Sequence, residues 1–248
     1  MINEKNVLHI NDIDIPIYRI FSIERFKEMI KTNELGLVRP SMWEDPYENF
    51  FLKTQVDFGN GDLASLEEIE KTWYGQCWTQ NEDTDAMWRI YSREKDGIRV
   101  KTTVRKLFSA IYDNSAAFPD LQFFIGKVQY KTKQEIIQLI ETITFTDVYL
   151  GGQNDKFAKL LCIKRDSFEH ENEIRILINE PDSTTELDKI YKVSIKPEDL
   201  FDEICLDPRL FKNDFLNLKA DIELMGVKTK IIQSDLYKLD IPMIIKAI

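Results

Sequence analysis

The sequence predicts a single α+β domain over residues 1–248, built on a mixed, mostly antiparallel β-sheet with helices around it. Apolar residues recur with period two in some segments and with helical spacing in others. The two kinds of segment are interspersed without the regular spacing of βαβ units. No internal repeat, low-complexity tract or Pro- and Ser-rich linker divides the chain, and 43% of its residues are hydrophobic. One core-forming unit is therefore the expected organisation.

The elements follow from these patterns in chain order. Ser22 is expected to cap a helix, because Ile23, Phe26 and Ile30 behind it share one helical face. Asp83 or Thr84 is expected to cap a second helix. The expected strands are 13–21, 35–38, 73–79, 97–101, 123–130, 173–178, 189–195, 201–206 and 228–233, with a Gly-rich turn at 58–62. The expected helices are 23–32, 84–93, 104–112, 133–145, 155–163 and 215–225.

Composition narrows the function classes. The net charge is −10, so few Lys and Arg are left over for the phosphate backbone, and no broad nucleic-acid-binding surface is expected. Three scattered cysteines without a C-x-x-C pair and two histidines predict reduced thiols and no metal site. No signal-peptide pattern or long apolar run occurs, so we expect a cytoplasmic protein with no membrane partner. Walker, G-x-G-x-x-G, H-E-x-x-H and G-x-S-x-G motifs are absent from the sequence.

The most informative stretch runs from Phe168 to Ile178. Period two places Glu171, Glu173 and Arg175 on one face of the expected strand, opposite its isoleucines. Neighbouring carboxylates repel each other, so at least one should titrate abnormally or face a cation or ligand. The alternative is an exposed strand face that carries ordinary surface charges.

A second constellation is Arg19, on the same strand face as Ile17 and Phe21. A guanidinium on an apolar face needs anionic or hydrogen-bonding partners, because it cannot lose its charge. A phosphate or ribose ligand and a structural salt bridge are both open.

Two aromatic groups complete the candidates. The loop with Trp43, Asp45 and Glu48 could clamp a base or ribose, or could be an Asp-Pro turn pinned by buried aromatics. Met87, Trp88 and Tyr91 form one helical ridge, which is either core packing or part of a binding surface.

In order, the segments Tyr18-Arg19, Trp43-x-Asp45-Pro46-x-Glu48, Cys77-Trp78, Met87-Trp88-x-x-Tyr91 and Phe168-x-x-Glu171-x-Glu173-x-Arg175 resemble an uncharacterised bacterial family. Some of its members are linked to abortive-infection defence against phage. The chain departs from the family pattern at Glu44, where Asn is usual, and at Phe168, where Trp is usual. The resemblance covers about residues 15–180 and leaves 181–248 as a C-terminal α/β extension.

The chain also resembles the ADP-ribosyltransferases in the order of its motifs. An Arg lies on an early strand, a polar residue on a middle strand, and E-x-E on a late strand. This resemblance implies a split sheet with NAD as substrate. Arg19 would hold the phosphate or ribose, and Thr79 would shape the nicotinamide pocket. Glu173 would stabilise the oxocarbenium ion, and Glu171 would orient the acceptor. The remaining predicted NAD-binding residues are Tyr18, Trp43, Asp45, Glu48, Trp78, Trp88, Tyr91 and Arg175, with the three tryptophans as stacking partners.

Three function classes remain open. The first is a cytoplasmic effector that acts as an NAD-dependent ADP-ribosyltransferase or NAD glycohydrolase, with a protein or nucleic acid as acceptor. The second is a nuclease in which Asp45, Glu48, Glu171 and Glu173 gather Mg²⁺ and Lys164 assists. The third is a non-catalytic sensing or partner-binding module of a defence system. In the first class, Glu173 is expected at an exposed cleft position, where Glu173→Gln changes stability little.

Overall fold

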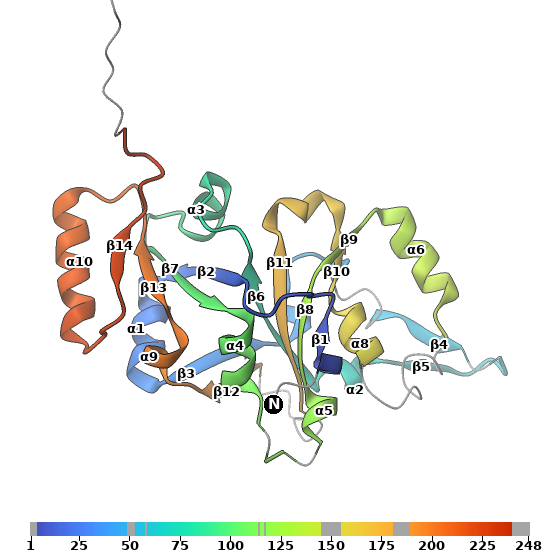
Figure 1. Cartoon of the computed structure of the whole chain (residues 1–248). Helices are drawn as coiled ribbons and strands as arrows, with labels where there is room; N and C mark the ends of the chain where they lie inside the picture. Colours follow the sequence, from blue (N-terminus) through green and yellow to red (C-terminus); the bar gives the residue numbers. More distant parts are fainter. Residues whose placement is uncertain are drawn as a thin grey trace, which may run out of the picture.

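The structure is a computed structural model that describes residues 4–48, 53–57, 59–113, 115, 116, 118–144, 155–180 and 189–239. These residues form a ten-stranded sheet and two small two-stranded sheets, with helices packed around them (Figure 1). The predicted α+β class is confirmed.

The large sheet has a mixed but mostly antiparallel topology. Its main path, in spatial order, is β1 (Val7–Leu8), β8 (Phe123–Lys127), β11 (Glu173–Asn179), β6 (Trp73–Thr79), β2 (Pro16–Ser22), β7 (Gly97–Thr103), β13 (Glu203–Leu206) and β14 (Ile231–Gln233). Off this path, β3 (Glu34–Val38) pairs with β6 and with β12 (Ile190–Ser194). The β1–β8 and β13–β14 pairs are parallel, and the others are antiparallel.

The sheet is divided at β6. On one side β6 pairs with β11 along the whole strand, from Glu173–Thr79 to Asn179–Trp73. On the other side β6 meets β2 only at the Tyr18–Thr79 pair, and it meets β3 only at Val38–Gly75. The predicted split sheet therefore has its seam between β6 and β2.

Two short sheets and the helices complete the fold. β9 (Gln129–Lys131) and β10 (Ile163–Arg165) pair in parallel, and β4 (Gln55–Asp57) pairs with β5 (Leu63–Ser65). The α-helices are α1 (Ile23–Thr32), α2 (Glu67–Glu70), α3 (Asp85–Tyr91), α4 (Val104–Ile111), α5 (Pro119–Gln122), α6 (Lys133–Thr142), α8 (Asp155–Leu160), α9 (Pro197–Leu200) and α10 (Lys212–Leu224). The 3₁₀ turns are η1 (Glu4–Asn6), η2 (Pro40–Met42) and η4 (Asp166–Glu171).

Local sequence explains where several helices begin. The Ser22 hydroxyl accepts the Arg25 amide of α1, and the Thr84 hydroxyl accepts the Met87 amide of α3. Both N-caps lie at predicted positions, and α1 has the predicted bounds. Phe145, the predicted end of α6, lies outside the described residues.

Two predicted boundaries are wrong because tertiary pairing replaces them. The helix expected to reach Ile163 ends at Leu160, since Ile163 pairs with Gln129 in the small β9–β10 sheet. The strand expected over 123–130 divides into β8 and β9 at Val128. These two changes bring β10 beside the start of β11.

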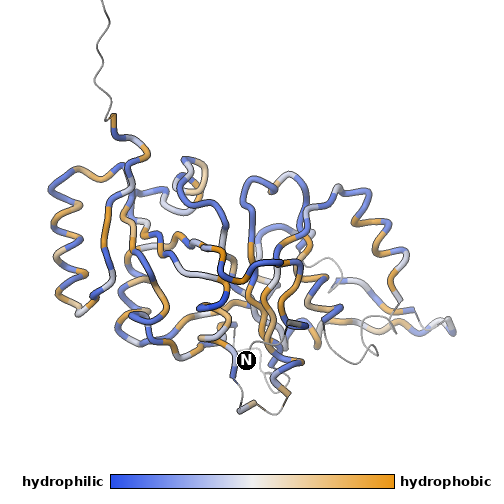
Figure 2. Tube along the Cα trace, in the orientation of Figure 1, coloured by the Kyte–Doolittle hydropathy of each residue, from blue (hydrophilic) through white to orange (hydrophobic). Residues whose placement is uncertain are grey.

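Apolar side chains fill both faces of the sheet. Ile174, Ile176 and Ile178 of β11 join the largest core with α1 and α4, whereas Leu177 packs with α8 on the opposite face. A third cluster places Met87 and Trp88 of α3 against β2 and β13. At the edge, apolar and polar residues alternate along α10 (Figure 2). All seven residues of β11 are buried, so the alternative of an exposed strand face is wrong.

Candidate functional site

A buried ionic cluster lies at the start of β11. The Lys164 ammonium on β10 lies 2.8 Å from a Glu48 oxygen, 2.5 Å from a Glu171 oxygen and 3.1 Å from a Glu173 oxygen. The Arg175 guanidinium pairs with Glu173 at 2.7 Å and with Glu48 at 3.0 Å. We call Glu48, Lys164, Glu171, Glu173 and Arg175 the Glu173 cluster. It contains three carboxylates and two cations.

Strand register puts these side chains together. Glu173 lies opposite Thr79 and Arg175 lies opposite Cys77, so all four side chains share one face of the sheet. Glu171 comes from the η4 turn that precedes the strand, not from the strand itself as predicted. Asn172 is left-handed with φ 45°, and it redirects the chain from the turn into β11.

The Trp43 loop closes one side of the cluster. The Arg175 guanidinium lies over the Trp43 ring at 4.3 Å from its centroid, and it donates to the Leu161 carbonyl at 2.6 Å. Gly75 permits this arrangement, since a Cβ there would lie 2.7 Å from Trp43 Cζ2. Asp45 pairs with Arg165 at 2.9 Å, outside its own turn. The loop therefore joins the cluster through Trp43 and Glu48 and anchors to β10 through Asp45.

The two carboxylates of the E-x-E pair titrate in opposite directions. Burial alone would raise the pKa of Glu173, but Arg175 and Lys164 outweigh it and hold that pKa at about 2. Burial raises the pKa of Glu171 above its usual value despite the Lys164 ammonium. The three carboxylates raise the pKa of Lys164 against the effect of its burial. One acid is thus held ionised, while its neighbour retains protons more readily.

Arg19 lies at the seam and approaches the cluster through Cys77. Its guanidinium donates to the Cys77 carbonyl at 2.5 Å and lies within electrostatic range of Glu173 and Tyr91. The Cys77 thiol in turn hydrogen-bonds the Glu173 carboxylate. Since Tyr18 and Glu173 both pair with Thr79, the strands of Arg19 and Glu173 flank β6. Arg19 finds a carbonyl partner here, in place of the carboxylate that a structural salt bridge would need.

Two predicted NAD-binding tryptophans do not face the cluster. Trp78 alternates with Cys77 and Thr79, so its ring points into the core on the opposite face. Trp88 is fully buried against β2 and β13, where its indole Nε1 donates to Asp83 at 2.5 Å. Both tryptophan rings are buried, so neither presents a free face for a base to stack on in this structure. Tyr18 pairs with Thr79 and so lies on the same sheet face as Glu173, but it is buried, with its ring centroid 5.1 Å from the Arg99 guanidinium.

In this structure the Thr79 hydroxyl makes hydrogen bonds within the protein. Its hydroxyl donates to the Glu171 carbonyl at 2.5 Å and accepts the Asn81 amide at 3.0 Å. Thr79 therefore fixes the turn that carries Glu171.

Four partly exposed side chains surround the acidic pair. Arg19 and Cys77 are intermediate in exposure, and Tyr91 is 42% exposed. Tyr130 on β9 is also partly exposed, and its hydroxyl accepts the Glu173 amide at 2.9 Å. Tyr91 and Tyr130 both lie within electrostatic range of Glu171 and Glu173. Solvent therefore reaches the neighbourhood of the E-x-E pair, although Glu173 itself is 1% exposed.

Sequence reasoning missed Tyr130, and it considered Lys164 only as a nuclease lysine. A charge that directly follows the apolar run Leu160-Leu161-Cys162-Ile163 was the available signal for Lys164. Tyr130 had no such signal, because its contact depends on the pairing of β9 with β10.

Among the described residues, no group of three or more His, Cys, Asp or Glu side chains could hold a metal ion. The Lys164 ammonium lies between the carboxylates that the nuclease hypothesis assigns to Mg²⁺. Asp45 is paired with Arg165 instead of joining them.

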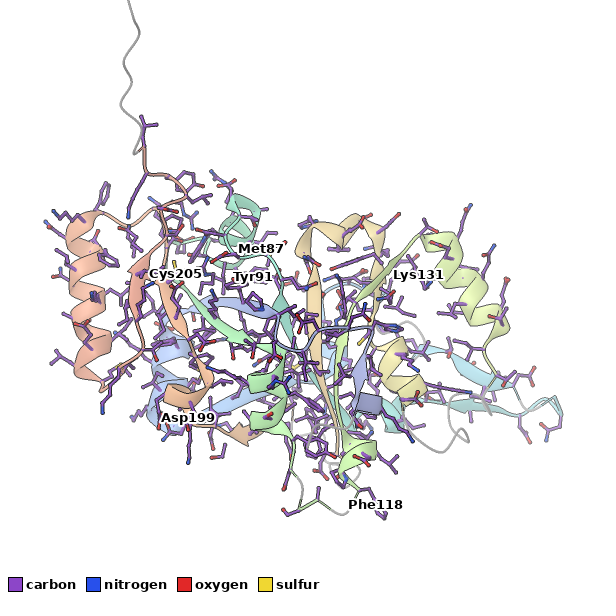
Figure 3. The ribbon with its side chains drawn as sticks, viewed as in Figure 1. Met87, Tyr91, Phe118, Lys131, Asp199 and Cys205 are labelled. Carbon is purple, nitrogen blue, oxygen red and sulfur yellow. The ribbon has the colours of Figure 1, made fainter. Side chains whose placement is uncertain are left out.

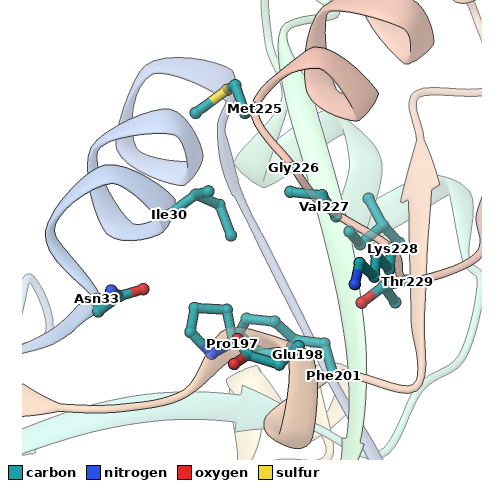
Figure 4. A pocket seen from close by; sticks show the side chains of 11 residues that line it. Ile30, Asn33, Pro197, Glu198, Phe201, Met225, Gly226, Val227, Lys228 and Thr229 are labelled. Carbon is teal, nitrogen blue, oxygen red and sulfur yellow. The ribbon is translucent and has the colours of Figure 1, made fainter.

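The described surface also has a pocket of about 140 Å³, between α1, α9 and the turn after α10 (Figure 4). None of the predicted site residues lines it. None of the described helices is long and apolar enough to span a membrane.

Comparisons with known proteins give one family model and a distant structural likeness. A model described as a protein of unknown function (DUF2971) matches residues 87–176, a range that contains Tyr91, Tyr130, Lys164, Glu171 and Glu173. No curated protein matches the chain.

The structural likeness is to DarT from Thermus sp. 2.9. Its complex with NAD⁺ matches at 10% identity with a TM-score of 0.40, covering 91% of this chain and 97% of that chain. Its complex with ADP-ribosylated ssDNA matches at 10% identity with a TM-score of 0.40, covering 92% and 96%. Its complex with carba-NAD⁺ matches at 9% identity with a TM-score of 0.39, covering 89% and 96%. At this distance the likeness assigns no role to a residue of this chain.

Proposed function

We propose that this protein cleaves the bond between nicotinamide and ribose in NAD, as a cytoplasmic ADP-ribosyltransferase or NAD glycohydrolase effector. The observation that carries the proposal is the charge of the Glu173 cluster, in which three buried carboxylates face two cations. An uncompensated negative charge in a buried site favours a cationic ligand. The nicotinamide riboside of NAD brings such a charge.

The opposite pKa shifts fit the two roles that this reaction needs. When the C1′–N bond breaks, its electron pair leaves with neutral nicotinamide and positive charge develops on the ribose. Glu173 remains ionised at neutral pH, because its pKa is held at about 2, and can stabilise that charge. Glu171, whose pKa is raised, is the better base for the proton of the acceptor hydroxyl.

Arg19 is the cation best placed for the anionic part of NAD. It is partly exposed at the seam, and its described hydrogen bond to Cys77 uses one of several guanidinium donors. A phosphate oxygen can take the others without breaking the contact with β6. Arg19 is therefore the residue that we expect to bind the phosphate or ribose of NAD.

Lys164 must change its contacts for substrate to reach Glu173. Its ammonium occupies the position between the carboxylates where the ribosyl charge would develop, and both cations cannot be there at once. The ammonium already lies 4.8 Å from the centroid of the Phe168 ring, and this cation–π contact can remain when the carboxylate contacts are given up.

Incubation with NAD labelled in the ADP-ribose part tests the proposal. Nicotinamide release reports cleavage, and label on protein or nucleic acid reports transfer and identifies the class of acceptor. Glu173→Gln should lower nicotinamide release by about 10²- to 10³-fold, as the loss of a preorganised electrostatic group does. Glu171→Gln should reduce transfer more than hydrolysis.

Asp207→Asn is the matched control, since Asp207 is equally buried and paired with Arg209 outside the cluster. Its folded fraction should cleave NAD at the wild-type rate. Wild-type protein that neither binds nor consumes NAD would contradict the proposal.

Burial of Glu173 favours a second candidate, a non-catalytic binding module of a defence system. A carboxylate that is 1% exposed and paired with two cations is also what a structural ion network looks like. Thermal denaturation separates the candidates, because NAD at 100 times its dissociation constant stabilises by about 2.7 kcal/mol. No shift in melting temperature with NAD favours the binding module.

A further inference from the structure

Tyr130 is fixed against the start of β11. Its hydroxyl oxygen accepts the backbone amide of Glu173 at 2.9 Å, which ties the short strand β9 to the first residue of β11. The phenol therefore stands beside the carboxylate that the proposed reaction depends on.

The proton of this hydroxyl is available to a ligand. Within the described part of the chain, the Glu173 amide is the only hydrogen-bond partner of the Tyr130 oxygen, and there the oxygen is the acceptor. Burial raises the pKa of Tyr130, and the Glu173 carboxylate adds to this effect, so the phenol remains protonated at neutral pH. The partly exposed ring leaves room for a partner outside the protein.

Tyr91 supplies a second phenol from another element. It lies at the end of α3, and its pKa is raised by burial and by the Glu171 carboxylate. Glu171, Glu173 and Lys164 are electrostatic neighbours of both phenols. α3 and β9 lie on opposite sides of β11 (Figure 1), and Figure 3 labels Tyr91 on the α3 side and Lys131 on the β9 side.

We propose that Tyr130, together with Tyr91, selects a ligand whose sugar carries free hydroxyl groups. A hydroxyl group both accepts and donates, so it can accept a hydrogen bond from a phenol and donate one to a Glu171 or Glu173 oxygen. Ionised carboxylates can only accept, and protonated phenols placed beside them supply the missing donors. The inference rests on the proposed function and adds a specificity residue to it.

A ligand–protein double-mutant cycle tests the inference. Dissociation constants are measured by calorimetry for NAD and for its analogue that lacks both hydroxyls of the nicotinamide ribose, with wild type and with Tyr130→Phe. Wild type should bind the analogue roughly 3- to 10-fold more weakly than NAD, the effect of one neutral hydrogen bond. Tyr130→Phe should lose most of this discrimination.

Tyr112→Phe is the matched control, because its hydroxyl bonds Asp120 away from the cluster. It should discriminate like wild type. Tyr91→Phe, which leaves the Glu173 amide bonded, gives a second measurement if Tyr130→Phe folds poorly, and it should lose part of the discrimination.

Two results overturn different claims. If wild type binds NAD and both phenol variants discriminate as strongly as wild type, the inference about Tyr130 is wrong and the proposed function stands. If wild type does not bind NAD, both the proposed function and the inference about Tyr130 are wrong.

Discussion

Two buried charged clusters in this fold differ in how their charges are balanced. In the Asp207 cluster, which consists of Ser92, Asp207 and Arg209, one carboxylate faces one guanidinium. Asp207 accepts from the Ser92 hydroxyl at 2.5 Å and from Arg209 Nη2 at 2.6 Å, and the same guanidinium donates to the Ser92 and Trp88 carbonyls. The Glu173 cluster has one more carboxylate than it has cations, and the Tyr130 phenol, whose oxygen accepts from the Glu173 amide, lies beside it.

The difference separates a structural network from a candidate binding site. In the Asp207 cluster the protein supplies the cation and the hydrogen-bond donors of the carboxylate. The resulting bonds join the end of α3 to the end of β13. In the Glu173 cluster the balance is completed only by a proton or by an outside cation. Burial alone, which is common to both, does not distinguish them.

Removal of the central guanidinium should give the largest stability difference between the clusters. Arg175→Met leaves Glu173 and Glu48 buried beside a single cation, so the free energy of unfolding should fall by about 3–5 kcal/mol. Arg209→Met leaves only one carboxylate, that of Asp207, without its cation, and Ser92 still donates to it. The free energy of unfolding should therefore fall by about 1–3 kcal/mol. Urea unfolding at pH 7 measures both. Equal losses would mean that the extra carboxylate has no energetic effect.

Lys164→Met should cost less at low pH than at neutral pH. It removes the cation shared by Glu48, Glu171 and Glu173, and about 1–3 kcal/mol should be lost at pH 7. Without the ammonium, the pKa of Glu171 rises further, so protonation relieves the repulsion as pH falls. Unfolding curves from pH 5 to 8 measure this recovery. The exposed Lys159→Met is the control and should change stability by less than about 0.5 kcal/mol throughout.

The smallest expected effect is a change in the slope of stability against pH. Glu173, with its lowered pKa, stabilises the fold above its unfolded value and loses this contribution as pH falls towards about 2. Glu171 acts in the opposite direction. Because its folded pKa is raised, the native state holds its proton more tightly, and stability declines as pH rises through that pKa.

Glu171→Gln should therefore remove the decline of stability at pH values above the unfolded pKa of Glu171. It should leave in place the loss of stability at acidic pH that comes from Glu173. Melting temperatures of wild type and variant from pH 3 to 8 give the comparison. Asp207 has a lowered pKa, because Arg209 and Ser92 overcome its burial, so Asp207→Asn should leave the decline in place. A wild-type profile without any decline would contradict the raised pKa of Glu171.

Local patterns predicted most of the fold. β6 and α1 have the predicted bounds, because alternation and an N-cap lie within a few residues of each other in sequence. The β9–β10 sheet could not be predicted in this way. Its strands are three residues long and more than thirty residues apart, so the pairing depends on tertiary packing.

The site was predicted in part for the same reason. The grouping of Glu173 with Arg175 on one strand face followed from alternation. The expectation that Glu173 occupies an exposed cleft position is wrong, because Glu173 is buried and doubly paired. Trp78 and Thr79 were both placed in the NAD site, although neighbouring residues of a strand point to opposite faces of the sheet.

The seam beside β6 has a consequence for how the molecule opens. One residue pair joins β6 to β2, whereas β6 and β11 pair along seven residues. Backbone amides on the β6–β11 side should therefore exchange with deuterium as one slow unit, and those of β2, β7 and β13 as another. A transient parting of these units would break few backbone bonds and would uncover Arg19 and Cys77, which lie at the boundary. Such sub-global opening gives solvent a route to Glu173 while both halves of the molecule stay folded.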